Sequence, residues 1–217
     1  MHEHHLTVSR TARYHTLGNA ESPAQLWFVL HGHGQLAGRF LRHFAPIDDG
    51  SRLIVAPEAL SRYYLDEGVH GPDSRVGATW MTREDRLSEI NDYVAYLDAL
   101  SEYLLRSLRG SSPEIRVIGF SQGAATASRW AVMGRSRIDR LWLWGGTLPH
   151  DLDMAAAAPT LERMRLTIVL GRGDRFATTA LRAELPERLR KHGIEFRLIE
   201  FEGGHGIDPA TLRRVAE

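Results

Sequence analysis

The sequence predicts an α/β protein whose core is a mostly parallel sheet of six to seven strands, with helices on both faces and no lid domain. Short apolar segments rich in Val, Ile, Leu and Trp alternate with longer segments of helical periodicity, and that alternation is typical of βαβ units. At 217 residues the chain has the length of one domain, and nothing in it resembles a linker. We therefore expect a single domain over residues 1–217, with residues 1–11 as a frayed N-terminal segment.

Six apolar runs have the length and composition of buried strands. They cover residues 25–30, 52–56, 114–119, 140–144, 166–170 and 195–200. Residues 14–17 are expected to add an edge strand. The segments with helical periodicity cover residues 38–44, 87–108, 121–133, 178–192 and 209–216.

Two connections bear on access to a site. The run "AAAAP" at 155–159 is expected to be a short loop or a helix remnant, and because no sizeable insertion lies between residues 144 and 166, we expect no helical lid. The stretch 57–83 has no clean period and is too long for an idle connection in a compact domain. Long irregular loops at strand ends commonly form binding surfaces, so we expect this one to border the site.

The composition argues against several classes of function. Lysine plus arginine equals aspartate plus glutamate, 27 against 27, so no net charge attracts a polyanion and we expect no nucleic-acid partner. The absence of cysteine removes disulfides, thiolate metal ligands and cysteine nucleophiles. No segment approaches the ~18 apolar residues of a membrane helix, and the N-terminus carries no secretory apolar region. We expect no stable membrane insertion and a cytoplasmic protein.

A nucleophile motif stands where a predicted strand runs directly into a predicted helix. Residues 114–127 are "EIRVIGFSQGAATA", and they contain Gly119-Phe120-Ser121-Gln122-Gly123, a G-x-S-x-G pattern. In this context the turn holds the serine exposed above the end of the sheet, and the two glycines let neighbouring backbone approach closely. The alternative is an ordinary strand-to-helix turn. We interpret Ser121 as a candidate nucleophile.

A serine hydroxyl needs a base and an orienting carboxylate to become nucleophilic. Asp174 follows the predicted strand 166–170 in "GRGD", and His205 follows the last predicted strand in "GGHGI". The alternatives are a helix-capping Asp174 and a solvent-exposed loop histidine. Asp151 or Asp153 is the best substitute if Asp174 does not face His205. The order serine, acid, histidine predicts a Ser121–His205–Asp174 triad.

The segment "VLHGHGQ" at residues 29–35 follows the first predicted parallel strand. Acyl transfer needs two donors for an oxyanion, and in such a site they are the backbone N–H groups of the residue after the serine, Gln122, and of a glycine-rich loop residue, here His33. We expect the His33 side chain to be a bystander or pocket wall and His31 to brace the loop. A metal would need a complete ligand set, which the sequence lacks, and "HEHH" at 2–5 would bind metal only adventitiously. We expect no metal and no cofactor.

With these motifs in place, the chain resembles the α/β-hydrolase superfamily, and within it the small phospholipase/carboxylesterase family that includes acyl-protein thioesterases. "LHGHGQ", "GFSQGA", "GRGD" and "GGHGI" are similar to that family's oxyanion loop, nucleophile elbow, acid segment and terminal histidine segment. The resemblance implies cofactor-free hydrolysis of carboxylic esters or thioesters. It departs at "TWMTRED", where the family usually carries an aromatic after the tryptophan, and in the Tyr63-Tyr64 loop, and these departures concern substrate scope.

The function predicted is that of a serine hydrolase acting on small-molecule esters through an acyl-enzyme. Short- or medium-chain acyl esters are the main substrate class, with lysophospholipids and acyl thioesters as further ones. The alternative is a non-catalytic protein of the same fold that binds a small apolar ligand. Six loop residues are candidate pocket walls, namely Leu36, Tyr63, Tyr64, Trp80, Met81 and Phe176.

Overall fold

A seven-stranded sheet runs through the computed structural model, which describes residues 1–19, 21–108 and 111–217. The strand order is β1-β3-β2-β6-β7-β8-β9; β1 is antiparallel to β3 and every other pairing in this sheet is parallel. The strands are β1 (Tyr14–Gly18), β2 (Gln25–Leu30), β3 (Arg52–Pro57), β6 (Glu114–Phe120), β7 (Arg140–Trp144), β8 (Arg165–Gly171) and β9 (Phe196–Phe201). The predicted α/β class and mostly parallel sheet are confirmed.

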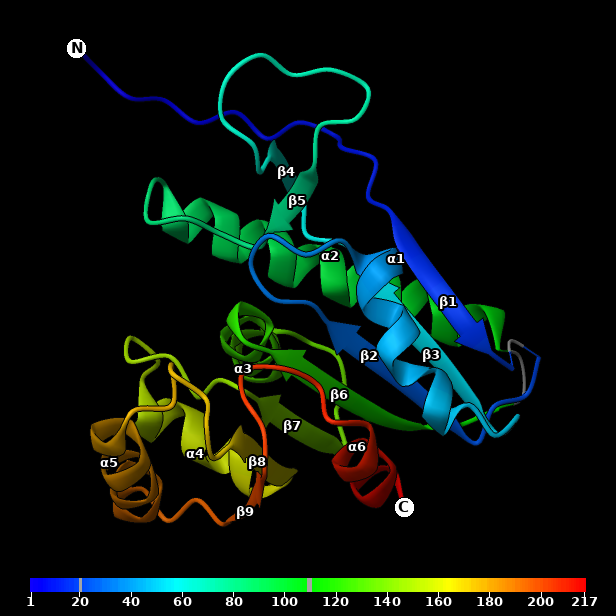
Figure 1. The fold of residues 1–217 in the computed structure, drawn as a ribbon, viewed down its shortest axis with the longest axis vertical. Helices are drawn as coiled ribbons and strands as arrows, with labels where there is room; N and C mark the ends of the chain where they lie inside the picture. The colour runs from blue at the N-terminus through cyan, green and yellow to red at the C-terminus, as the bar shows by residue number, and fades with distance from the viewer. Residues whose placement is uncertain (20, 109–110) are drawn as a thin grey trace.

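Helices cover both faces of this sheet (Figure 1). They are α1 (Ala37–Phe40), the 3-10 helix η1 (Leu41–Ile47), α2 (Arg86–Ser107), α3 (Gln122–Met133), α4 (Met154–Glu162), α5 (Thr179–Lys191) and α6 (Pro209–Ala216). Strand β2 shows why two layers form, because its side chains alternate. Leu26 and Phe28 pack in a core with residues of α2 and α3, whereas Trp27 and Val29 pack with α1, η1 and α6.

Two helical segments differ from the sequence prediction. The segment predicted at 38–44 is one turn of α-helix followed by η1, which contains Pro46. Proline has no backbone N–H to continue an α-helix. The alanine run at 155–159 belongs to a full helix, α4, because the Asp153 carboxylate accepts hydrogen bonds from the N–H groups of Ala155 and Ala156 and caps its start.

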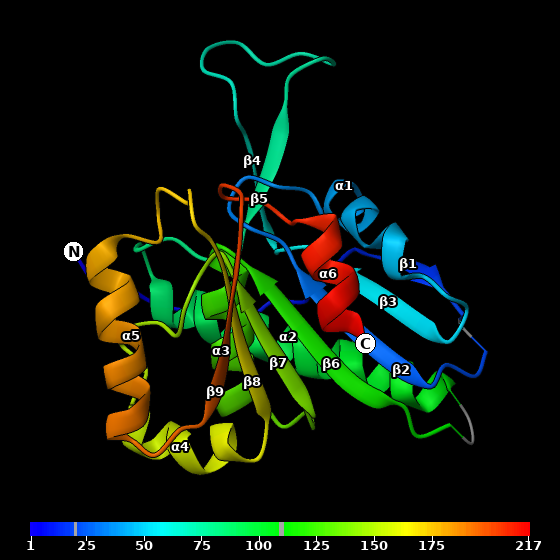
Figure 2. The same cartoon turned by 60° about the horizontal axis from the view of Figure 1, so that its bottom comes forward.

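The stretch 57–83 contains a hairpin that the sequence did not predict. Strands β4 (Ser61–Tyr64) and β5 (Val76–Thr79) pair antiparallel, and the loop at 65–75 that joins them stands out from the body of the molecule (Figure 2). A bridge between Gln35 and Ala78 attaches β5 to the loop after β2. The hairpin therefore borders the segment that carries the predicted oxyanion donor.

The parallel strands place the predicted motifs at one edge of the sheet. The loop after β2 holds His33, Ser121 directly follows β6, Asp174 follows β8 and His205 follows β9. Since the carboxyl ends of parallel strands share an edge, segments far apart in sequence meet there. None of the helices in the described part of the chain is long and apolar enough to cross a membrane.

Candidate active site

Ser121 occupies a strained turn between β6 and α3. Its φ of 55° and ψ of −117° lie in a region that L-residues rarely adopt. The Ser121 N–H donates to Trp144 O at 2.9 Å, and Ser121 O accepts from Ala124 N–H at 2.9 Å, so both sides of the turn are held. This is the backbone geometry of a nucleophile elbow.

The two glycines of the motif are required by close backbone packing. A β-carbon on Gly119 would lie 2.2 Å from Gly123 O, and one on Gly123 would lie 2.3 Å from Leu30 O. Both distances are far inside van der Waals contact. The G-x-S-x-G spacing therefore reflects how tightly α3 turns back over β6 and against the end of β2.

Asp174 and His205 are brought together by the loops after β8 and β9. His205 Nδ1 lies 2.7 Å from Asp174 Oδ2, and Asp174 Oδ1 accepts the Phe176 N–H at 2.8 Å. The Asp174 side chain is buried while the His205 side chain keeps 19% of its surface exposed. Because a carboxylate only accepts, this contact assigns the neutral imidazole the tautomer with its proton on Nδ1, in which Nε2 is the basic nitrogen.

Adjacent residues connect Ser121 with His205. The Phe120 ring centroid lies 4.9 Å from that of His205, and the Phe176 ring meets His205 edge-on at 4.7 Å. Gly145 lies against the His205 ring and Gly146 against the Ser121 carbonyl. Within the described residues no hydrogen bond joins Ser121 Oγ to the imidazole. Such bonds are often long before substrate binds.

The loop after β2 lies against the serine. A β-carbon on Gly32 would lie 3.1 Å from Ser121 Cβ. Gly32 N–H donates to Gln35 Oε1, and Gly34 N–H donates to Ala78 O. Across the described residues, no protein acceptor takes the His33 N–H. The two predicted amide donors, His33 and Gln122, thus belong to two separate segments, each of which adjoins Ser121.

The side chains of His33 and Gln122 have partners that the sequence did not indicate. His33 Nε2 lies 2.6 Å from Tyr63 Oη and its Nδ1 lies 3.2 Å from Thr79 Oγ1. The Gln122 amide bonds to Thr79 and Met81. The expectation that the His33 ring is a bystander in the chemistry or a pocket wall stays a prediction, and these contacts show in addition that the ring joins the loop to β4 and β5. Tyr63 and Thr79 follow His33 by 30 and 46 positions, and no local pattern links them.

His31 braces the loop, as expected from the sequence. Its ring is buried, with Nδ1 2.8 Å from Gly32 O and Nε2 accepting the Ala59 N–H at 3.1 Å. Burial lowers the pKa of His31, and the hydrogen bond to Gly32 and the Glu58 charge oppose that shift without overcoming it. A neutral imidazole with its proton on Nδ1 satisfies both bonds.

The six candidate pocket walls fall into different environments. Trp80 is 3% exposed, and its Nε1 donates to His31 O, so its indole belongs to the packed interior. Tyr64 and Phe176 are half exposed, and Tyr64 stacks on His70 outside the body of the sheet. Leu36, Met81 and Tyr63 are partly buried around the loop after β2 and the end of β5.

The alternative acids lie elsewhere. Asp151 pairs with Arg129 and Arg86, each at 2.7 Å. Burial alone would raise the pKa of Asp151, but the hydrogen bonds from these two arginines together outweigh it and hold the pKa below its usual range. Asp153 caps α4. Asp174 is the carboxylate that meets His205.

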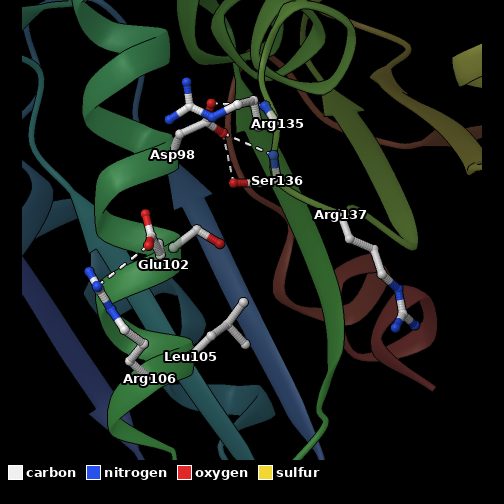
Figure 3. A pocket seen from close by; sticks show the side chains of 8 residues that line it. Asp98, Glu102, Leu105, Arg106, Arg135, Ser136 and Arg137 are labelled. Atoms are coloured by element: carbon white, nitrogen blue, oxygen red, sulfur yellow. Dashed lines mark hydrogen bonds and ion pairs between the residues drawn. The ribbon is translucent and has the colours of Figure 1, made fainter.

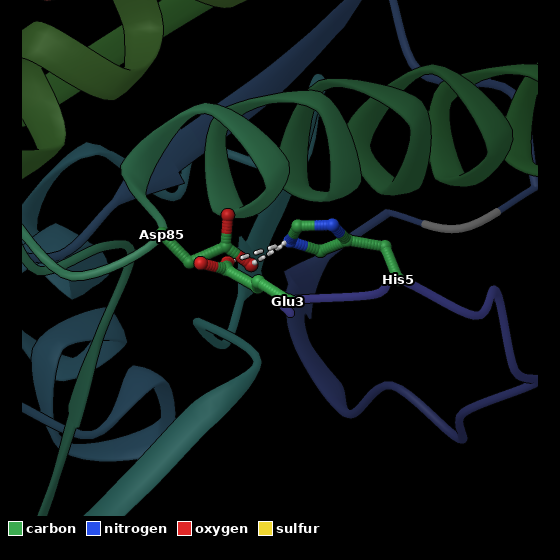
Figure 4. A group of neighbouring side chains, drawn as sticks. All are labelled: Glu3, His5 and Asp85. Carbon is green, nitrogen blue, oxygen red and sulfur yellow. Dashed lines mark hydrogen bonds and ion pairs between the residues drawn. The ribbon is translucent and has the colours of Figure 1, made fainter. Parts of the chain in front are cut away.

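One group of side chains in the described residues brings together ligand types that could hold a metal ion. Glu3, His5 and Asp85 bring ligand atoms within 4.8 Å of one another (Figure 4). All three are exposed, and the group shares no residue with the candidate active site. It lies in the histidine-rich N-terminal segment and at the start of α2.

An open groove of about 580 Å³ lies between α2 and the turn after α3 (Figure 3). The Asp98 carboxylate at its end accepts hydrogen bonds from Trp130, from both backbone and hydroxyl of Ser136, and from the Arg135 N–H. No lining residue belongs to the candidate active site. Asp98 thus serves to fasten α2 to the end of α3.

The model of the serine hydrolase (FSH1) family matches residues 49–215. The chain belongs to the serine hydrolase (FSH1) family. The match includes the Ser121 turn, Asp174 and His205, and it places this protein among hydrolases. The comparison with curated proteins gave no match.

The fold of this serine hydrolase family member is shared with solved esterases. Esterase PE8 has a TM-score of 0.68 at 21% identity over 95% of this chain and 97% of its own. Acyl-protein thioesterase 2 of Zea mays has a TM-score of 0.69 at 17% identity over 95% and 96%. A carboxylesterase from Mesorhizobium loti has a TM-score of 0.67 at 18% identity over 94% and 93%. The α/β-hydrolase fold is confirmed.

Proposed function

We propose that this protein hydrolyses carboxylic esters through an acyl-enzyme on Ser121, with His205 as general base and acid and Asp174 as its orienting carboxylate. The observation that carries the proposal is the 2.7 Å contact between His205 Nδ1 and Asp174 Oδ2. It leaves Nε2 as the free base beside the strained Ser121 turn. Ester chemistry needs no metal or cofactor here, because these groups supply nucleophile, base and oxyanion donors.

In the acylation step, His205 Nε2 takes the Ser121 proton as Oγ attacks the ester carbonyl. The carbonyl oxygen becomes an oxyanion that accepts hydrogen bonds from the N–H groups of His33 and Gln122. The Asp174 charge stabilises the imidazolium. Collapse of the adduct breaks the ester bond, and the alcohol leaves with the proton from His205.

In the deacylation step, water takes the place of the alcohol. His205 removes a proton from water as it attacks the acyl carbonyl, and the same two amides hold the second oxyanion. The C–O bond to Ser121 then breaks and Oγ recovers its proton from His205. The acid is released and the enzyme is regenerated.

Short- or medium-chain acyl esters are the substrate class we favour, with lysophospholipids and acyl thioesters next. The partial exposure of His205 and the exposed Phe176 beside it leave the site accessible from solvent. Of the three structural neighbours described above, one is named an acyl-protein thioesterase and the other two are named an esterase and a carboxylesterase. Hydrolysis rates measured on a series of p-nitrophenyl esters, an acyl-CoA and a lysophospholipid would rank these substrate classes.

Ser121→Ala tests the mechanism. We expect its kcat on p-nitrophenyl butyrate to fall by about 10³-fold or more, because the nucleophile is removed while the oxyanion donors remain. Ser128→Ala is the matched control. Ser128 lies in α3, the helix that begins after Ser121, and its hydroxyl donates to Ala124 O, so its loss should leave kcat unchanged.

A covalent label gives a second test. Mass spectrometry should find a fluorophosphonate on Ser121 in the folded parent. An active Ser121→Ala, or a parent that binds esters without turnover, would refute the proposal.

A further inference from the structure

The loop that carries the His33 amide is fastened to the β4–β5 hairpin along its backbone. Gly34 N–H donates to Ala78 O at 2.9 Å, and Ala78 N–H donates to Gln35 O at 3.1 Å. The approach is so close that a β-carbon on Gly77 would lie 2.5 Å from Gly34 O. The position of the His33 amide therefore depends on the hairpin as well as on the main sheet.

The His33 ring extends this connection to both strands of the hairpin. Tyr63 on β4 places its hydroxyl 2.6 Å from Nε2, and Thr79 at the end of β5 places its hydroxyl 3.2 Å from Nδ1. Thr79 is 3% exposed. The imidazole is thus held at both nitrogens, directly beside the backbone N–H that we assign to the oxyanion.

Gln122 reaches the same hydroxyl from the other side. Its Nε2 donates to Thr79 Oγ1 at 3.0 Å and to Met81 O at 2.8 Å, and its Oε1 accepts the Trp80 N–H at 3.1 Å. Gln122 is the residue after Ser121 and carries the second oxyanion amide. Thr79 is the one side chain in the described residues that bonds the side chains of both oxyanion residues.

One assignment of protons uses every donor in this network. The Tyr63 hydroxyl donates to His33 Nε2, and the His33 Nδ1–H donates to Thr79 Oγ1. Thr79 donates its single proton to Met81 O, while its second lone pair accepts from Gln122. The chain of bonds then runs without interruption from β4 to the start of α3.

We propose that Tyr63 and Thr79 are positioning residues that hold the backbone N–H groups of His33 and Gln122 at the spacing an oxyanion requires. The two amides come from different segments, so the distance between them depends on the contacts that join these segments, including the bonds of Thr79 with the side chains of His33 and Gln122. Oxyanion stabilisation depends steeply on donor placement. This inference rests on the proposed ester hydrolysis and concerns the transition state more than substrate binding.

The test compares Tyr63→Phe and Thr79→Val with the parent on p-nitrophenyl butyrate. We expect kcat to fall about three- to tenfold in Tyr63→Phe and about tenfold or more in Thr79→Val, with KM unchanged. The inhibition constant of a trifluoromethyl ketone, whose serine adduct is a tetrahedral oxyanion, should rise by the same factors. A residue that only contacts the acyl group would change KM instead.

Two further variants separate positioning from general structure. Thr79→Ser keeps the hydroxyl and should restore kcat, and Tyr103→Phe, on the exposed surface of α2, should match the parent. If Thr79→Val does not fold, Tyr63→Phe alone decides. Parent-like kcat in Tyr63→Phe, or a lower kcat without weaker ketone binding, overturns this inference. A parent that neither hydrolyses the ester nor labels at Ser121 overturns the proposed function instead.

Discussion

At the scale of single residues, the Asp174 carboxylate sets which nitrogen of His205 is basic. Asp174 Oδ1 accepts the Phe176 N–H, so in Asp174→Asn the amide oxygen keeps that bond and the amide N–H faces His205 Nδ1. This favours the tautomer with its proton on Nε2, which is unable to take the Ser121 proton. We expect kcat on p-nitrophenyl butyrate to fall about 10⁴-fold with KM little changed. Steady-state kinetics at neutral pH measure this directly.

Asp153→Asn is the control for that substitution. Asp153 is one of the two acids, with Asp151, that the sequence analysis named as substitutes for Asp174, and in the structure it caps α4. Asparagine is as good an N-cap as aspartate, so both stability and kcat should stay at parental values. If Asp153→Asn lost activity while Asp174→Asn kept it, the assignment of the acid would be reversed.

Residue roles were predictable where the chemistry is local. The G-x-S-x-G turn, "GRGD" and "GGHGI" each indicate a residue's role from positions close to it in the sequence. Ser121, Asp174 and His205 could therefore be proposed together. The bonds of the His33 ring could not be foreseen. They depend on two hydroxyl groups supplied by a hairpin later in the chain, and a hydroxyl in a loop has many possible partners.

At the scale of elements, the contact between β5 and the loop after β2 makes a prediction of its own. Gly77→Ala places a β-carbon 2.5 Å from Gly34 O, so the hairpin and the loop must separate. We expect kcat on p-nitrophenyl butyrate to fall at least about tenfold while the circular dichroism spectrum stays parental, because the main sheet does not include Gly77.

Gly71→Ala is the matched control on the same hairpin. Gly71 lies in the projecting loop, and a β-carbon there meets nothing within 4 Å. Its kcat should equal that of the parent. Equal losses in both variants would mean that the whole hairpin, rather than its contact with Gly34, governs the rate.

Strands were predicted well from the sequence where they are buried, because a buried strand shows a long apolar run. The buried strands β2 and β7 have their predicted bounds, since each is a continuous apolar run that follows one polar residue. The strands of the hairpin have four residues each and are separated by the loop at 65–75. Four residues carry too little periodicity to distinguish a strand from an irregular loop.

At the scale of the whole molecule, the site is assembled because parallel strands end at one edge. That rule let the order of the motifs predict their meeting in space. The side-chain contacts that join the segments around Arg13, Glu58 and the start of α1 were not predictable from the sequence. Glu58 has no exposed side-chain surface, and it accepts hydrogen bonds from Arg13, Arg62 and the Ala37 N–H at the start of α1.

Glu58→Gln tests this junction. The variant loses the negative charge that Arg13 and Arg62 share, and we expect the free energy of unfolding at pH 7 to fall by about 1 to 3 kcal/mol. Urea denaturation measures it. Glu102→Gln is the control, because Glu102 pairs with Arg106 on the exposed face of α2 and should lose less than about 0.5 kcal/mol.

The pH dependence of the difference in free energy of unfolding between the parent and Glu58→Gln shows whether the lost charge causes that difference. Burial alone would raise the pKa of Glu58, but the hydrogen bonds from Arg62 and Arg13 outweigh it and hold the pKa below the ordinary value of 4.5. As pH falls, Glu58 in the unfolded chain therefore binds its proton before Glu58 in the folded protein does. The stability that Glu58 contributes is fully present above about pH 4.5 and is lost as pH falls through the folded pKa. Parent and Glu58→Gln should therefore differ most at neutral pH and converge in acid. A difference that stayed constant from pH 7 to pH 3 would assign the loss to packing of the side chain, since packing does not titrate.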